Sequence, residues 1–163
     1  MAEEKQEKVT IVMFSGELDK ALAGFIIATT AASMGMKVTM FFTFWGLNII
    51  KKNEGSLQSS GWMERMLNWM NRGGSKRLKL SHFHMMGMGT WMIKKLMKKN
   101  KVPQLEELIV MAKQMGVEMI ACTTTCGLMG GLEEPSFIPQ AQNLAGAAYF
   151  LGEARDSKIT LFI

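Results

Sequence analysis

The run KVTIVMFSGELDKALAGFIIATTAASMGMKVTMFFTFW, residues 8–45, decides the fold. Its first part, residues 8–15, is apolar and rich in β-branched side chains, so it predicts a buried strand. Acidic residues follow a Ser-Gly pair and favour a helix start, and we expect this helix at about residues 17–34. Gly35 ends the helix, and residues 36–45 predict a second strand. A strand, a helix and a strand within about forty residues form a βαβ unit with a right-handed crossover and a parallel sheet.

The same region has so few charges that we asked whether it spans a membrane. Residues 21–50 carry a single charge, Lys37. Neither part on either side of Lys37 reaches the ~20 apolar residues that a span requires. Small and polar residues interrupt the first part, and the second has the composition of a strand. We therefore interpret this region as a buried helix and a buried strand.

The second half of the chain continues the alternation of helices and strands. Residues 103–115 form an amphipathic helix with Gly116 as its cap, and residues 117–121 form a short buried strand. Pro135 and Pro139 mark an irregular segment, after which a helical stripe at about 147–154 precedes a last strand at 158–163. We predict one α/β domain over residues 1–163, with a doubly wound, mainly parallel sheet of about five strands and helices on both faces.

A basic segment interrupts this alternation, and we expect it to be an insertion at about residues 48–101. From Lys51 to Lys101 there are twelve Lys or Arg against two Glu, a local charge of +10, so the net charge of +5 leaves −5 for the remainder. The segment also holds eight of the 17 methionines. Positive charge beside soft, adaptable side chains predicts a contact surface for an acidic partner, a subunit or a membrane. Residues 62–70 form a helix by periodicity, and we favour its packing on its own domain over an exposed docking surface.

The sequence of this segment gives little support for a metal, nucleotide or nucleic-acid site. His82 and His84 lie near several methionines, which could bind copper(I), but two histidines at this spacing more often pack or meet solvent. The glycines Gly87 and Gly89 lack the spacing of a dinucleotide-binding loop. The basic segment also lacks a stacking platform for nucleic acid. We expect no metal, no cofactor and no nucleic-acid partner.

The chemistry is predicted at the two cysteines of the chain. Cys122 comes at the carboxyl end of the strand at 117–121, where open α/β sheets bind ligands. Backbone N–H groups of the following turn would lower the pKa of its thiol and favour a reactive thiolate. Cys126 either resolves an oxidised or persulfidated Cys122 or packs as a small apolar residue, and packing is also the alternative for Cys122. Two cysteines exclude a disulfide framework, and the charged first residues lack a secretory signal, so we expect a reducing cytoplasm.

With these elements placed, the sequence resembles the DsrE/DsrF-like family of small sulfur-relay proteins, in particular its DsrE-related, peroxiredoxin-like subgroup. The resemblance covers most of the chain and depends on the order and spacing of short motifs. These motifs are residues 42–47 (FTFWGL), 87–90 (GMGT), 121–122 (AC), 129–130 (MG), 149–154 (YFLGEA) and 161–163 (LFI).

The resemblance implies a doubly wound sheet, a homo-oligomer such as a trimer or hexamer, and a cysteine that accepts sulfane sulfur as a persulfide. The residue that matches this cysteine is Cys122. Its partners would be a small sulfur-carrier protein or a rhodanese-like donor. A second cysteine at Cys126 is not a general family feature, so its role is a separate hypothesis. No residue here supports a peroxidase activity.

Sulfur transfer is therefore the first function hypothesis, with the chain as a sulfurtransferase that carries a persulfide on Cys122. Backbone N–H groups and hydroxyls would stabilise the thiolate, and apolar side chains would exclude water; the predicted substrate-binding residues are Thr123, Thr124, Thr125, Gly127, Met129 and Phe44. The alternative is a non-catalytic oligomeric scaffold or membrane-surface adaptor that uses the basic Met-rich segment, and burial of Cys122 would favour it. A third hypothesis is a copper(I) binder built from both cysteines and the His/Met loop.

Overall fold

Five parallel strands form the centre of the fold in the computed structural model, which describes residues 6–52, 61–141 and 143–163. The sheet order is β4-β3-β2-β1-β5. The chain thus runs outward from β1 to β4 and then returns to the other side of β1. The strands are β1 (Lys8–Met13), β2 (Lys37–Phe42), β3 (Glu118–Cys122), β4 (Asn143–Ala145) and β5 (Ile159–Phe162).

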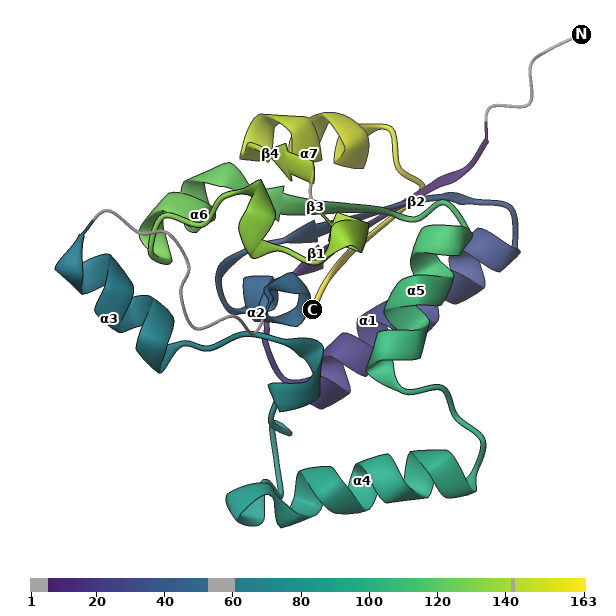
Figure 1. The fold of residues 1–163 in the computed structure, drawn as a ribbon. Helices are drawn as coiled ribbons and strands as arrows, with labels where there is room; N and C mark the ends of the chain where they lie inside the picture. The colour runs from purple at the N-terminus through teal and green to yellow at the C-terminus, as the bar shows by residue number, and fades with distance from the viewer. Residues whose placement is uncertain (1–5, 53–60, 142) are drawn as a thin grey trace, which may run out of the picture.

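Two helices cover one face of this sheet, α1 (Leu18–Ser33) and α5 (Leu105–Gln114) (Figure 1). Side chains alternate between the two faces of a strand. Every second residue of β1 and β2 therefore joins the main core beneath these helices, with Met13 and Phe42 fully buried there. Phe25 of α1 packs on Phe42 with ring centroids 6.1 Å apart.

The helix α7 (Ala147–Arg155) covers the opposite face (Figure 1). Phe150 of α7 packs on Phe41 with ring centroids 5.2 Å apart. Glu153 accepts hydrogen bonds from Lys8 and Lys37 at 3.3 and 3.2 Å, which ties α7 to the start of the sheet. Helices on both faces and the return to β5 confirm the predicted doubly wound, parallel α/β fold.

Several element boundaries differ from the predictions. The second strand ends at Phe42 rather than at residue 45, because the chain turns into a short 3₁₀ helix, η1 (Phe44–Gly46). The helix α5 begins after Pro103, with Gln104 as its N-cap. The three-residue strand β4 lies in the segment predicted to be irregular, and it is too short to show an alternating pattern.

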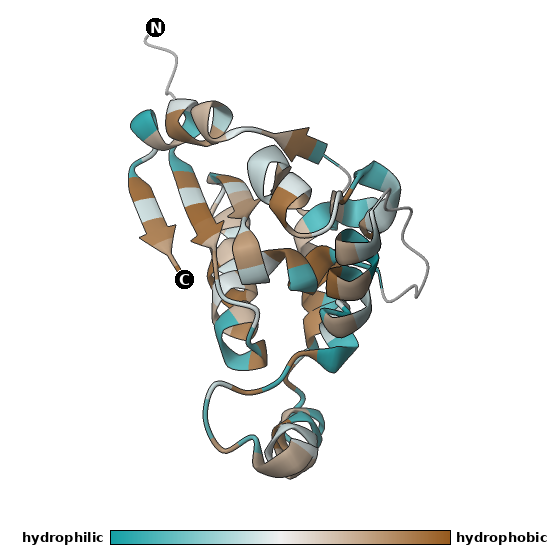
Figure 2. Cartoon of the chain, turned by 90° about the vertical axis from the view of Figure 1, so that its left-hand side faces the viewer, coloured by the Kyte–Doolittle hydropathy of each residue, from teal (hydrophilic) through white to brown (hydrophobic). Residues whose placement is uncertain are grey.

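The basic segment at 48–101 carries separate helices on the outside of the domain. The helix α2 (Leu47–Ile50) leads into it, and α3 (Trp62–Met70) and α4 (Met88–Lys99) follow, with the short 3₁₀ helices η2 (Ser75–Arg77) and η3 (Met85–Gly87) between them. The helix α3 has no buried residue, and Trp62 and Trp69 are 75% and 65% exposed. The apolar residues of this helix are therefore exposed, and the helix contacts its own domain through its polar residue Asn68. The helix α4 lies at one end of the molecule (Figures 1 and 2), and its buried residue Met97 belongs to the main core.

One lysine of the basic segment is buried rather than solvated. Lys51 is 1% exposed, and its ammonium donates hydrogen bonds to Asn68 Oδ1 at 2.9 Å and to the Asn71 carbonyl at 3.0 Å. Burial lowers the pKa of Lys51 to about 8. Asn68 in turn donates to the carbonyl of Gly130 at 2.9 Å, so Lys51 links the outer helix α3 to the body of the domain.

Apolar side chains also reach the surface along α1 and the edge strand β5. Figure 2 shows apolar residues along β5 up to the carboxyl end of the chain. Ile26, Met34, Ile159 and Phe162 are between 43% and 73% exposed. Within the described ranges, no helix is both long enough and apolar enough to cross a membrane.

Candidate thiol site

Cys122 is the last residue of β3, and the helix α6 (Thr123–Leu128) begins directly after it. Ala121 belongs to the main core, so the alternation of the strand places Cys122 on the opposite face, the one that α7 covers. There Cys122 packs with Phe41, Ile120 and the half-buried Ala145 and Phe150. The residue is 5% exposed. The predicted position at a strand end is confirmed, and the thiol is buried.

Hydrogen bonds surround the sulfur of Cys122. Burial raises the pKa of this thiol, but hydrogen bonds lower it, and the net pKa lies below the ordinary value for cysteine. The donors are the hydroxyl and backbone N–H of Thr125, the hydroxyl of Thr43 and the backbone N–H of Thr124. Donors that face a thiolate stabilise the charged form. The site therefore favours a thiolate despite its burial.

Thr43 reaches this site because of the strand register. Phe42 at the end of β2 pairs with Ala121 in β3, so the next residues of the two strands, Thr43 and Cys122, lie side by side. Thr43 Oγ1 is 2.8 Å from Thr125 Oγ1, so one hydroxyl donates to the other and only one of the two donates to the sulfur at a time. The sequence pattern does not single out Thr43. If β2 and β3 are aligned at their last apolar residues before the threonines, Thr43 falls beside Cys122, and this alignment could have identified Thr43.

The turn after β2 fixes the position of Thr43. The Thr43 N–H donates to the Met13 carbonyl at 3.0 Å, and the Gly46 N–H donates to the Phe14 and Thr43 carbonyls at 2.8 and 3.0 Å. A Cβ at Gly46 would lie 1.9 Å from the Met13 carbonyl oxygen, so only glycine fits there. The loops after β1 and β2 are therefore packed backbone to backbone.

Phe44 lies in this turn with a φ of 47°, a left-handed conformation that is uncommon for a bulky residue. The residue is 41% exposed, and its ring packs on Phe14 with centroids 5.4 Å apart. Phe44 therefore follows directly on Thr43, which faces the sulfur, while its own ring packs against the loop after β1.

Cys126 lies in a different environment from Cys122. It is 3% exposed and belongs to the main core on the other side of the sheet. Burial, together with the charge of the neighbouring Cys122, raises the pKa of Cys126 to about 12. At neutral pH this thiol is protonated and behaves as a small apolar side chain.

The other predicted site residues separate into two groups. Thr124 and Thr125 contribute donors to the sulfur, whereas Thr123 and Gly127 are exposed on α6. Met129 is half-buried and packs against the main core, not in the cluster that contains Cys122. Among the residues that the structure describes, no group of three His, Cys, Asp or Glu side chains could hold a metal ion.

Comparison with known proteins gives one family and two similar chains. The model of the DsrE/DsrF/DrsH-like family matches residues 5–162. An uncharacterized protein, YrkE of Bacillus subtilis (strain 168), is 41% identical over 160 residues, which cover 98% of this chain and 99% of YrkE. The sulfur carrier protein DsrE2 of Allochromatium vinosum is 36% identical over 169 residues, again with 98% of this chain and 99% of the relative.

Proposed function

The chain belongs to the DsrE/DsrF/DrsH-like family, and from this premise we propose that it is a sulfur-relay protein that carries sulfane sulfur as a persulfide on Cys122. The relative named a sulfur carrier covers nearly the whole chain, which supports a relay role. The observation that carries the assignment to Cys122 is its set of hydrogen-bond donors from Thr43, Thr124 and Thr125.

The transfer consists of two exchange steps. The Cys122 thiolate attacks the outer sulfur of a donor persulfide, R–S–SH, the donor S–S bond breaks, and RS⁻ leaves while Cys122–S–SH forms. An acceptor thiolate then attacks the outer sulfur, and the Cys122 thiolate leaves. Each step forms one S–S bond and breaks another, so no external oxidant or reductant is needed. A lowered pKa supports both steps, because it raises the thiolate fraction and makes Cys122 a better leaving group.

Access to the sulfur depends on the residues that cover it. Ala145 of β4 and Phe150 of α7 lie over the cluster that contains Cys122. The polar contacts that hold α7 to the sheet are partly exposed: Tyr149 donates to the carboxylate of Glu118 at 3.1 Å, and Lys37 pairs with Glu153. We propose that a donor or acceptor thiol reaches Cys122 when α7 moves away from the sheet and uncovers the sulfur.

Cys126 differs from Cys122 in its pKa and in its position. A pKa of about 12 leaves little thiolate at neutral pH, and the side chain lies in the main core. These observations support a packing role. The resolving role stays a prediction that a Cys126 variant can test.

Self-association is part of the proposal. Exposed apolar side chains of α1 and β5 line a groove of about 270 Å³, which includes Ile26, Met34 and Ile159. We propose that this face contacts other copies of the chain in a trimer or hexamer. A small sulfur-carrier protein or a rhodanese-like protein is the proposed exchange partner, because each presents a persulfide to an acceptor thiol.

Two observations favour the alternative, a non-catalytic scaffold or membrane-surface adaptor. Cys122 is buried, α3 and α4 expose tryptophan and methionine, and α4 also carries four lysines. On α4, Lys95 lies 4.8 Å from the ring centroid of Trp91, so charge and apolar surface meet there. In this function both cysteines would only pack.

Sulfur loading separates the two functions. We expect reduced protein exposed to polysulfide, and separately to thiosulfate, to gain one or more sulfur atoms in its intact mass. The gain should be absent in Cys122→Ser and preserved in Cys126→Ser, because the pKa of Cys122 is lowered whereas burial raises the pKa of Cys126 to about 12. A disulfide that forms only when Cys126 is present would give Cys126 the resolving role. If neither donor adds mass and both thiols resist alkylation in the folded protein, sulfur transfer is ruled out and the scaffold is favoured.

A further inference from the structure

A cavity separate from Cys122 opens where the chain leaves β1 and β2. Its volume is about 510 Å³, within the range of about 300–1,000 Å³ that small-molecule sites occupy. Three segments form its walls: the loop from β1 into α1, the turn and helix after β2, and the chain from the end of α3 to residue 79.

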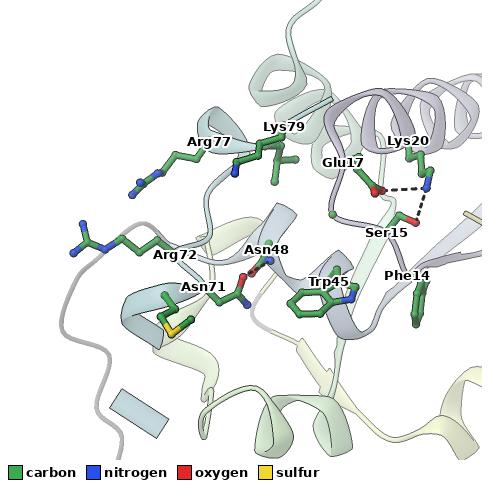
Figure 3. A pocket seen from close by; sticks show the side chains of 13 residues that line it. Phe14, Ser15, Glu17, Lys20, Trp45, Asn48, Asn71, Arg72, Arg77 and Lys79 are labelled. Carbon is green, nitrogen blue, oxygen red and sulfur yellow. Dashed lines mark hydrogen bonds and ion pairs between the residues drawn. The ribbon is translucent and has the colours of Figure 1, made fainter. Parts of the chain in front are cut away.

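The charge of this cavity is strongly positive. Four cations, Lys20, Arg72, Arg77 and Lys79, line it against one carboxylate, Glu17. That carboxylate is already engaged, because Lys20 Nζ lies 3.1 Å from Glu17 Oε2 and also donates to Ser15 Oγ at 3.3 Å (Figure 3). The lining therefore carries a net excess of positive charge, which favours an anionic occupant.

Polar and aromatic groups complete the lining. Asn48 Nδ2 donates to Asn71 Oδ1 at 2.8 Å, whereas Asn48 Oδ1 is buried and has no hydrogen-bond partner in the part of the chain that the structure describes. Trp45 is 52% exposed, and Figure 3 shows its indole between the arginine side and the Ser15 side of the cavity. A flat apolar group could lie against this indole.

The place of the cavity in the fold agrees with a ligand site. It lies at the carboxyl ends of two neighbouring parallel strands, where open α/β sheets bind ligands. Thr43 of the turn after β2 faces Cys122, and Trp45 of the same turn faces the cavity. Cys122 is not among the lining residues, so the cavity is a second site rather than part of the thiol site.

We propose that this cavity binds a small organic dianion, a molecule with phosphate or carboxylate oxygens and a flat apolar group. The oxygens contact Arg72 and Lys79, and the flat group lies on Trp45. The proposal does not depend on sulfur transfer at Cys122.

Calorimetric titration of the full chain tests this proposal with three probes of similar size. Phenyl phosphate and phthalate carry two negative charges and an aromatic ring, and benzyl alcohol carries the ring alone. We expect both dianions, or one of them, to bind with one site per chain, and benzyl alcohol to give no measurable binding. Preference for one dianion identifies phosphate or carboxylate as the recognised group. The double variant Arg72→Gln/Lys79→Gln should weaken binding by about tenfold or more, because two charge-assisted contacts are lost.

A matched variant separates a site from general attraction to a basic protein. Lys99→Gln/Lys113→Gln removes the same net charge from exposed positions outside the cavity, and its affinity should stay within about twofold of wild type because exposed distant charges are screened. Equal weakening in the two double variants would overturn the proposal. Absence of binding by both dianions, or equal binding of benzyl alcohol, would also overturn it. Loading of sulfur on Cys122 should be unchanged in both variants. A failure of anion binding can therefore be distinguished from a failure of sulfur transfer.

Discussion

Replacement of Thr125 with valine is expected to raise the pKa of the Cys122 thiol by about one unit or more. Thr125 supplies the hydroxyl donor to the sulfur, and the same hydroxyl lies 2.8 Å from Thr43 Oγ1. A hydrogen bond to a charged group contributes about 1.5–3 kcal/mol, and one pKa unit corresponds to about 1.36 kcal/mol. Valine keeps the shape of threonine but removes the donor, so desolvation by burial is no longer offset. Thr43→Val should act in the same direction.

The rate of alkylation by iodoacetamide as a function of pH measures this shift, in a Cys126→Ala background that leaves one thiol. At pH values below the pKa, the thiolate fraction falls about tenfold for each unit by which the pKa rises. The variant should therefore react roughly tenfold more slowly at low pH and equally fast once the pH exceeds both pKa values. Thr124→Val is the matched control, because Thr124 donates through its backbone and its side chain is exposed. An equal shift in the control, or no shift in Thr125→Val, would contradict the assigned donors.

Gly46→Ala is expected to lower the free energy of unfolding by about 3 kcal/mol or more. Gly46 has a φ of −59° and a ψ of −26°, so alanine could adopt its backbone conformation. The obstacle is space, because the added Cβ would lie 1.9 Å from the Met13 carbonyl oxygen, and backbone cannot yield as a flexible side chain does. The loops after β1 and β2 would have to separate, which would also displace Thr43 from Cys122.

Gly152→Ala is the control for this substitution. Gly152 lies in the interior of α7, is exposed, and has no neighbour within 4 Å of an added Cβ. Alanine is favoured over glycine inside a helix by up to about 1 kcal/mol, so this variant should be slightly more stable. Denaturant unfolding of both variants gives the comparison. A loss at Gly46 no larger than about 1 kcal/mol would show that the two loops are not held together as described.

The parallel sheet could be predicted from sequence because its determinants are local. Residues 8–45 contain two apolar runs on either side of a helix, and the handedness of such a unit follows from general sterics. The position of Cys122 at a strand end follows from the apolar run before it. Thr43 depends instead on which residue of β2 pairs with Ala121, and a register between distant segments leaves no periodic signal in the chain.

Which side chains of the basic segment are buried could not be predicted from the sequence either. The spacing of Trp62, Met66 and Trp69 predicts a helix but does not show what its apolar face contacts, and in the structure that face is exposed. Lys51 contributes to the local positive charge in the sequence, yet it lies beneath α3 with hydrogen bonds to two asparagines. Charge counts assign lysine to the surface because most lysines are there, and only the three-dimensional contacts reveal the exception.

Transfer of sulfur from the loaded protein tests most directly whether Cys122 both accepts and releases sulfane sulfur. Wild-type protein would be loaded with polysulfide, separated from the donor, and mixed with a small acceptor thiol while the intact masses of both are followed. We predict that the protein loses the added sulfur and that the acceptor gains it, with no transfer from Cys122→Ser and normal transfer from Cys126→Ser. Loading of wild type and Cys122→Ser to the same extent, or sulfur that stays on the protein in excess thiol, would contradict this role of Cys122.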